Sequence, residues 1–174
     1  MENYSKGKIC ILVEQLYQDL EAWYPYYRLK EACYETIFVG TGSSKNYQGK
    51  HSYPLEVEAD IQDIRPEDFV GVIIPGGWAP TKLRLNKDVL NFVNKIDQKG
   101  KLVAAICHGG WVLSSAGIAR GRILTSYIDL KDDLINAGAE WVDKEVVLDK
   151  NLVTSRHPND LPAFCRTILT VLSK

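Results

Sequence analysis

The stretch Lys101-Leu102-Val103-Ala104-Ala105-Ile106-Cys107-His108-Gly109-Gly110 decides the fold and points to the chemistry. Its apolar part predicts a buried strand, and its end predicts a tight turn. The segment 111–116 that follows predicts the start of a helix. A cysteine at such a turn is lifted into a cleft, as in a nucleophile elbow, although the G-x-S-x-G pattern is absent. The N–H groups of the helix start are expected to favour the thiolate of Cys107. The alternative is a buried cysteine that only fills space.

The composition is that of an ordinary globular protein. With 174 residues, the chain fits one domain, so we expect a single domain over 1–174. The 21 basic and 22 acidic side chains are scattered, which predicts neither nucleic-acid nor membrane binding. No apolar run reaches membrane-spanning length and the start lacks a secretion signal, so we expect a cytoplasmic protein. Four cysteines without a C-x-x-C pair are expected as thiols: Cys10, Cys33, Cys107 and Cys165.

Apolar runs and helical patterns alternate along the chain. Strands are predicted at 8–13, 34–40, 70–74, 101–107, 145–149 and 152–155, helices at 20–32, 83–99, 111–116, 130–137 and 160–172, and a hairpin at 47–59. This alternation predicts an α/β fold with a mainly parallel sheet. Ligands of such sheets bind beyond the carboxyl ends of the strands. We therefore expect Cys107, the Gly76-Gly77 pair and the acids of 14–21 to meet in one cleft.

A cysteine nucleophile needs a base and an oxyanion site. His108 follows Cys107 directly and can act as the base only if the turn is sharply strained; otherwise it contacts backbone or a neighbouring subunit. The backbone amides of Gly76, Gly77 and His108 are the natural oxyanion donors, because they lie at strand ends. The alternative for the two glycines is a simple tight turn.

The acids after the first strand are the other candidates. A carboxyl group close to a thiolate has a raised pKa and can donate a hydrogen bond to sulfur. Glu14, Asp19 and Glu21 all qualify, and for each the alternative is an exposed acid at a helix start. His51 and His157 lie in loop-like segments and are expected at the surface. No histidine pairs with carboxylates at ligand spacing, so we predict no metal and no other cofactor.

Taken together, these residues resemble the PfpI family of intracellular cysteine proteases, in the DJ-1/PfpI superfamily. The resemblance runs from about Lys8 to Leu172 and is carried by five segments: Ala105-Ile106-Cys107-His108-Gly109, Pro75-Gly76-Gly77, Tyr24-Pro25-Tyr26, Gly49-Lys50-His51 and Lys131-Asp132-Asp133-Leu134-Ile135-Asn136-Ala137-Gly138-Ala139. It implies a flavodoxin-like three-layer sandwich related to class I glutamine amidotransferase domains. It also implies a strained backbone at Cys107, the approach of Glu21 to its sulfur, and homodimers that can build hexamers.

Two departures from the family pattern concern acids. Family peptidases offer an acid after the Pro-Gly-Gly turn to the histidine across a subunit contact, and the matching position here is Thr81. Threonine cannot hold an imidazolium electrostatically, which puts a Cys–His–acid triad in doubt. The first acid of the Phe-Glu-Asp-x-Glu stretch is here Gln18, whereas Glu21 is kept. Trp78 and Trp111 add bulk, which suggests a narrower or altered substrate.

The resemblance implies chemistry in which a thiolate attacks an electrophilic carbonyl. Our first hypothesis is an enzyme that acts on small reactive carbonyls or glycated adducts, as a glyoxalase or protein deglycase in stress protection. The second is an intracellular cysteine peptidase with peptide substrates, against which Thr81 argues. The third is a non-catalytic redox sensor or stress-binding protein, in which the thiol oxidises to a sulfinic acid.

Overall fold

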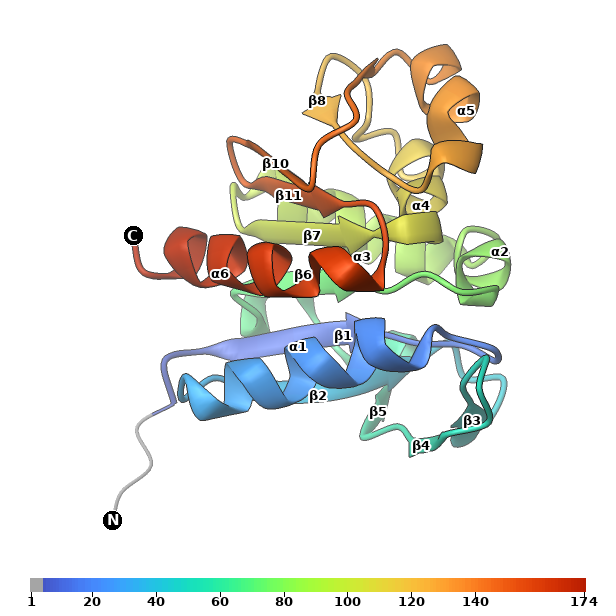
Figure 1. The fold of residues 1–174 in the computed structure, drawn as a ribbon. Coiled ribbons are helices and arrows are strands. Elements are labelled where there is room, and N and C mark those ends of the chain that lie inside the picture. Colours follow the sequence, from blue (N-terminus) through green and yellow to red (C-terminus); the bar gives the residue numbers. More distant parts are fainter. Residues whose placement is uncertain (1–4) are drawn as a thin grey trace.

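A computed structural model describes residues 5–174. A seven-stranded sheet lies between two layers of helices, with strand order β10-β11-β7-β6-β1-β2-β5 (Figure 1). The strands are β1 (Lys8–Leu12), β2 (Glu35–Gly40), β5 (Ala59–Asp60), β6 (Gly71–Ile74), β7 (Leu102–Ile106), β10 (Val146–Asp149) and β11 (Leu152–Ser155). All neighbours pair in parallel except β10 and β11, which form an antiparallel hairpin. The predicted flavodoxin-like α/β sandwich with a mainly parallel sheet is confirmed.

The central strands form because their apolar side chains are covered on both faces. Every residue of β6 and β7 is buried, as is β1 after Lys8. Continuous apolar runs of this kind are typical of parallel strands that lie between two helical layers. The register places Ile74 beside Ala105 and Ser155 beside Ile106, so β6, β7 and β11 end at one edge of the sheet.

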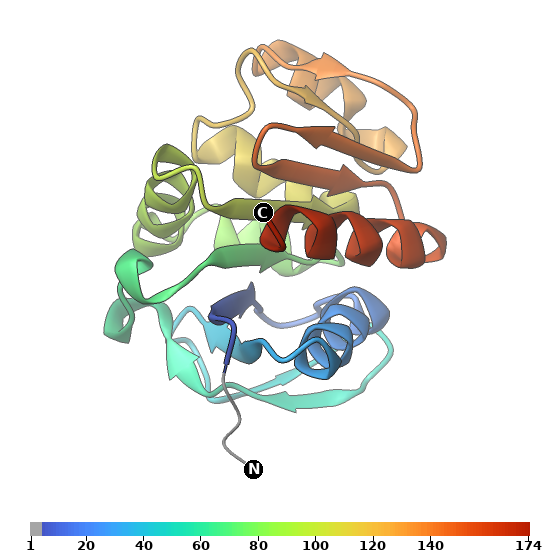
Figure 2. The same ribbon diagram turned by 90° about the vertical axis from the view of Figure 1, so that its left-hand side faces the viewer.

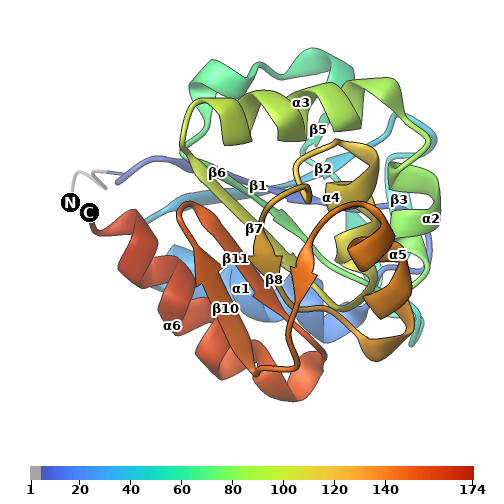
Figure 3. The ribbon, with the colours of Figure 1, turned by 90° about the horizontal axis from the view of Figure 1, so that it is seen from above.

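Helices cover both faces of the sheet (Figures 2 and 3). The helices α1 (Asp19–Glu31) and α6 (Leu161–Leu172) lie against each other on one face. On the other face α3 (Lys87–Gln98) packs on β6 and β7, with α2 (Ala79–Leu83) and α4 (Gly110–Ser115) beside it. The helix α5 (Lys131–Asn136) contacts α4 and lies beside the small pair β8 (Ile123–Leu124) and β9 (Glu140–Trp141). Within residues 5–174, no helix has the length and apolar character needed to cross a bilayer.

Several element boundaries differ from the sequence prediction. The helix predicted over 83–99 is α3, which begins only at Lys87 because the Asn86 side chain accepts from the N–H groups of Asp88 and Val89. The short helix α2 before it is not predicted from the sequence. Pro25 lies inside α1 and does not start it, since Gln18 caps the helix. The predicted hairpin at 47–59 is confirmed as β3 (Asn46–Gln48) and β4 (Pro54–Glu56). The strands β5 and β9 have two residues each, too few to show a period in sequence.

Single turns of 3-10 helix connect the larger elements. They are η1 (Ile61–Asp63), η2 (Pro66–Asp68), η3 (Cys107–Gly109), η4 (Ile128–Leu130) and η5 (Pro158–Asp160). Both η3 and η5 follow a strand of the central sheet, after β7 and β11 respectively. Two neighbouring strand ends therefore lead into turns at the same edge, which is where ligands of open parallel sheets bind.

A hydrogen-bonded cluster around Arg122 lies at the opposite end of the strands, where β7 and β11 begin. The Arg122 guanidinium lies 3.4 Å from Asp97 and 3.3 Å from Asp149, and it donates to the Asn151 side chain over 2.9 Å. Asn151 in turn donates to the Lys101 carbonyl over 2.8 Å. Because Lys101 and Asn151 directly precede β7 and β11, the cluster fixes the starts of the two strands whose ends carry the site.

Candidate active site

Cys107 occupies a sharp turn at the end of β7. It is the first residue of η3, has φ +59°, and is 8% exposed. A non-glycine residue in this left-handed region is held there against a cost of about 1 kcal/mol or more. The turn is tight enough that a Cβ added at Gly109 would lie 2.3 Å from the Ile74 carbonyl oxygen. The strained elbow that the sequence predicted is therefore present, and the strain is held by the packing of η3 on β6.

Glu21 enters the site from the first turn of α1 and is fully buried. Its own N–H donates to the capping oxygen of Gln18 over 2.9 Å, and its Oε2 accepts from the N–H of Gly76 over 2.7 Å. Among the described residues, no hydrogen-bond donor meets Oε1. Burial raises the pKa of Glu21 to about 7, and contacts with the Gly76 N–H and the Cys107 thiol, together with the charge of Lys50, oppose that rise. Near neutral pH this carboxyl group can therefore both give and take a proton.

The Cys107 thiol is held in its neutral form. Burial first, and the charge of Glu21 second, raise its pKa to about 12, although the backbone N–H groups of His108 and Gly77 favour the thiolate. The prediction that the helix start would lower this pKa is wrong for the resting site. The helix α4 that follows has only six residues, and burial of the thiol and the charge of Glu21 raise the pKa. When Glu21 is protonated this repulsion disappears, so the two groups titrate as a pair.

The backbone N–H groups expected to act as oxyanion donors have two different roles in the structure: one binds Glu21, and the others act on the sulfur of Cys107. The N–H of Gly76 is taken by Glu21, so its assignment as an oxyanion donor is wrong in this state. The N–H groups of Gly77 and His108 act on the sulfur and remain candidates. Gly77 has φ +79°, and a Cβ there would lie 2.5 Å from the Leu16 carbonyl oxygen, so this close approach requires glycine.

His108 lies beside the sulfur. Its Nδ1 is 3.3 Å from Sγ of Cys107, which the strained turn makes possible for adjacent residues. The ring stacks on Tyr127 with centroids 5.2 Å apart and meets the edge of Trp111 at 5.1 Å. Burial lowers the pKa of His108, and the charge of Asp129 partly opposes this. The imidazole is therefore neutral at physiological pH and can accept or relay a proton.

No carboxylate of residues 5–174 lies within hydrogen-bond or ion-pair distance of His108. The Thr81 hydroxyl donates to the carbonyl of Trp78 over 2.7 Å and does not replace the acid of a triad. Glu14 and Asp19 also lie elsewhere: Glu14 accepts from the hydroxyls of Thr41 and Ser43, and Asp19 from two backbone N–H groups of the β3–β4 loop. Of the three candidate acids, the structure brings only Glu21 to Cys107.

A cavity of about 350 Å³ opens over the sulfur. Its lining comes from six segments of the chain and comprises Gln18, Glu21, Lys50, Gly77, Trp78, Cys107, His108, Tyr127, Asp129, His157 and Pro158. The expectation that His157 is a surface residue is wrong, since it is half-buried and faces this cavity. The strand register could have located His157. Ser155 pairs with Ile106, and His157 and His108 each lie two residues beyond this pair, so both histidines follow the same end of the sheet. His51 is exposed, as expected.

The two tryptophans have different positions. Trp78 lines the cavity and is 57% exposed, whereas Trp111 packs against His108 and donates to Asp133 over 2.7 Å. Trp78 therefore narrows the entrance, and Trp111 holds the histidine ring. Lys50, Tyr127 and Asp129 were not identified from sequence as lining residues, because they come from connections whose course a linear pattern does not reveal.

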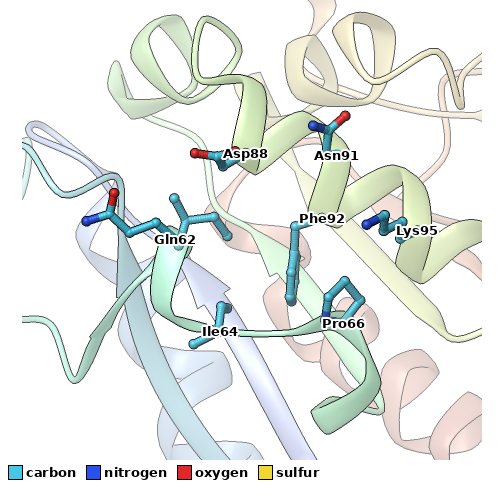
Figure 4. A pocket seen from close by; sticks show the side chains of 8 residues that line it. Gln62, Ile64, Pro66, Asp88, Asn91, Phe92 and Lys95 are labelled. Carbon is cyan, nitrogen blue, oxygen red and sulfur yellow. The ribbon is translucent and has the colours of Figure 1, made fainter.

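A second hollow of about 240 Å³ lies between the η1–η2 segment and α3 (Figure 4). Gln62, Asp88, Asn91 and Lys95 surround Phe92 there. It contains no cysteine, serine or histidine. Across residues 5–174, no group of three histidine, cysteine, aspartate or glutamate side chains is placed to hold a metal ion. The cavity over Cys107 is thus the best candidate for chemistry.

Comparison with known sequences agrees with this geometry. A model of the DJ-1/PfpI family matches residues 7–171. The chain is 43% identical over 165 residues to a protein named deglycase PfpI of Pyrococcus furiosus, with 95% of this chain and 99% of that protein covered. It is 38% identical over 165 residues to a protein named putative cysteine protease YraA of Bacillus subtilis, with 95% of this chain and 98% of that protein covered.

Solved structures have the same architecture. A two-domain protein of Anabaena variabilis with DJ-1/ThiJ/PfpI-like and ferritin-like domains superposes with a TM-score of 0.94 at 38% identity. The match covers 96% of this chain and 48% of that one, so the chain spans about half of that protein. DJ-1 of Schizosaccharomyces pombe matches with a TM-score of 0.85 at 22% identity, over 94% of this chain and 90% of that one. At that identity the likeness concerns the fold alone.

Proposed function

Because the chain belongs to the DJ-1/PfpI family, we propose that it is a cysteine-dependent enzyme that acts on reactive carbonyl compounds, as a glyoxalase or deglycase that protects against carbonyl stress in the cytoplasm. The observation that carries this proposal is the pair of Cys107 and Glu21, in which a nucleophile lies beside a buried carboxyl group with a pKa of about 7. The name of a similar protein, deglycase PfpI of Pyrococcus furiosus, supports it.

The first step forms a bond between Sγ of Cys107 and the aldehyde carbon of a 2-oxoaldehyde. The thiol proton passes through Glu21 to the carbonyl oxygen, so a hemithioacetal forms with no net change in charge. The N–H groups of Gly77 and His108 lie where they can stabilise negative charge during this addition.

The second step moves a proton within the adduct. A base, Glu21 or the neutral His108, removes the proton from the former aldehyde carbon, and the neighbouring carbonyl becomes an enediol. Return of the proton to the second carbon gives a thioester of a 2-hydroxy acid. Water then cleaves the thioester, which releases the hydroxy acid and restores the thiol, so the net reaction consumes one water. With an adduct on an amine or thiol, the bond between its carbon and the amine nitrogen or thiol sulfur breaks as Sγ of Cys107 bonds to that carbon. The free amine or thiol leaves with the proton of Cys107, and the hemithioacetal that remains follows the same course.

The test is consumption of methylglyoxal in amine-free buffer, with lactate measured as product. We expect wild-type protein to form lactate and Cys107→Ala to form none above background. The matched control is Cys33→Ala, because Cys33 is exposed and does not line the cavity. Equal lactate formation by the Cys107→Ala variant would exclude this mechanism.

A redox-sensing role is the second candidate. One observation favours it: the same N–H groups that act on the sulfur could hold the oxygens of a sulfinate. The mass of the Cys107 peptide after mild peroxide tests this role. A peptidase has less support, because His108 has no acid partner within residues 5–174 and would need one from another subunit of an oligomer.

A further inference from the structure

Lys50 is the cation of the cavity. It belongs to the loop between β3 and β4, and its side chain lines the space over Cys107. Its charge reaches the reacting groups, since it lowers the pKa of both Glu21 and His108. Within residues 5–174, its ammonium group has no ion-pair or hydrogen-bond partner in the structure, although ten other ion pairs are present. An unpaired ammonium group at the mouth of a site is free to bind an anion.

The backbone that carries Lys50 is held on both sides. The N–H of Lys50 donates to the Tyr17 carbonyl over 2.7 Å. The carboxylate of Asp19 accepts from the N–H groups of His51 at 2.9 Å and Tyr53 at 3.1 Å. A Cβ added at Gly49 would lie 2.2 Å from Oδ1 of Asp19, so only glycine allows this approach. The buried Asp19, which the proposed reaction does not use, therefore fixes the position from which Lys50 extends.

The charges of the cavity are arranged on different walls. Lys50 lies on the wall formed by the β3–β4 hairpin, whereas Asp129 lies in η4, which directly precedes α5. Asp129 acts on the pKa of His108, and Lys50 acts on that of Glu21 as well. The carboxyl group of Glu21 is neutral when protonated and adds negative charge beside the sulfur when ionised. A substrate carboxylate would therefore be attracted to the Lys50 wall and repelled from the η4 wall.

We propose that Lys50 binds the carboxylate of the substrate, so that the site prefers carbonyl compounds and adducts that carry a carboxylate, such as those formed on free amino acids, over neutral ones of equal size. For the reaction this inference depends on the proposed function, but the recognition of the anion can be measured without turnover. In this arrangement Lys50 is a specificity-determining residue, and Asp19 is a positioning residue for it.

The test compares two alkylating reagents that differ only in charge, iodoacetate and iodoacetamide. Both attack the same thiolate, so the ratio of their rates at Cys107 cancels any change in the pKa of the thiol. We expect Lys50→Met to lower the iodoacetate-to-iodoacetamide ratio about threefold to fivefold, and added salt to lower it in the wild type. Lys50→Arg should restore it. The rates are read from the mass of the Cys107 peptide.

The matched control is Lys45→Met, which removes an exposed lysine near the same hairpin that does not line the cavity. An equal ratio in wild-type and Lys50→Met protein, or an equal fall in the Lys45→Met variant, would overturn the proposal. Asp19→Asn tests the positioning role, with the ratio expected to fall while far-ultraviolet circular dichroism stays unchanged. If wild-type protein forms no lactate from methylglyoxal, the proposed reaction fails, but the alkylation ratio still decides whether Lys50 binds anions.

A turnover measurement extends the test to substrates. The methylglyoxal adducts of N-acetylcysteine and of N-acetylcysteine amide differ by one carboxylate. We expect wild-type kcat/KM to favour the carboxylate adduct, mainly through KM, and Lys50→Met to remove most of that preference. A preference that survives the Lys50→Met substitution would contradict the assignment of Lys50.

Discussion

The backbone N–H of Gly76 donates to Oε2 of Glu21 over 2.7 Å. This bond joins the loop after β6 to the first turn of α1, and it fixes one oxygen of a carboxyl group whose other oxygen has no hydrogen-bond donor among the described residues. A carboxyl group held in this way keeps one orientation toward the sulfur in both protonation states. Proton exchange with Cys107 then requires no movement of the side chain.

Gly76→Ala should disable the site with a limited loss of stability. The new Cβ would lie 2.8 Å from Cβ of Cys107 and 2.8 Å from Oε2 of Glu21, and both groups must shift. We expect lactate formation to fall more than tenfold and the free energy of unfolding to fall by about 1 to 3 kcal/mol. Gly100→Ala is the control, since nothing lies within 4 Å of its added Cβ, although its φ of +66° carries some strain. Comparable activity losses in both variants would contradict this argument.

Glu21→Gln should change how stability depends on pH. The pKa of Glu21 is about 7 in the folded protein and 4.5 for an ordinary glutamate, so the folded state binds the proton more tightly. Its stabilising contribution is complete below pH 4.5 and is lost as the pH rises through 7, by roughly 3 kcal/mol. Glutamine keeps an acceptor for Gly76 and stays neutral, so we expect that loss to disappear in the variant.

Urea unfolding of both proteins between pH 5 and pH 8 measures this difference. Glu56→Gln serves as the control, because Glu56 is exposed and should leave the pH dependence unchanged. Parallel stability curves for wild-type and Glu21→Gln protein would show that the folded pKa of Glu21 is not raised.

The same Glu21→Gln substitution should separate thiol reactivity from turnover. Removal of the carboxylate removes one of the two main causes that raise the pKa of Cys107, so alkylation by iodoacetamide should begin at lower pH. Lactate formation should nevertheless fall about 100-fold or more, because glutamine cannot carry a proton. A pH profile of alkylation next to a methylglyoxal assay provides both readouts. Parallel losses in both would instead indicate a structural role for Glu21.

Arg122→Ala should destabilise the protein without changing the chemistry of Cys107. The Arg122 side chain is 12% exposed and lies between two carboxylates that are 17% and 18% exposed, so its loss leaves them unpaired. We expect a loss of about 2 to 4 kcal/mol in the free energy of unfolding. Arg166→Ala removes an exposed arginine and should have little effect. An altered rate of Cys107 alkylation in folded Arg122→Ala protein would contradict the separation of the two edges of the sheet.

The fold followed from sequence largely because the central strands are apolar on both faces. The apolar runs around Ile9, Val72 and Val103 are predicted as buried strands, and the predicted bounds agree with those in the structure within a residue or two. The predicted start of α3 lies four residues too early, because the amphipathic pattern continues across Asn86, whose capping bond depends on the fold. The five-residue helix α2 is not predicted from the sequence. At the site, the nucleophile was found from its turn, whereas its pKa depends on burial and on Glu21, which no local pattern contains.

The bridge between Tyr17 and Gly77 joins the loop before α1 to the loop after β6, together with bonds from Gln18 N–H to the Gly76 carbonyl and from Trp78 N–H to the Leu16 carbonyl. These hydrogen bonds join the loop that leads to Glu21 and the loop that carries the Gly77 amide into one network at the base of the cavity. The backbone amides of both loops should therefore exchange slowly, and a change that speeds exchange in one loop should speed it in the other. The hairpin that carries Lys50 is joined to the loop before α1, because the Lys50 N–H donates to the Tyr17 carbonyl, whereas η4 makes none of these bonds. Side chains on the η4 wall can therefore change without altering the backbone that holds Glu21 and the Gly77 amide.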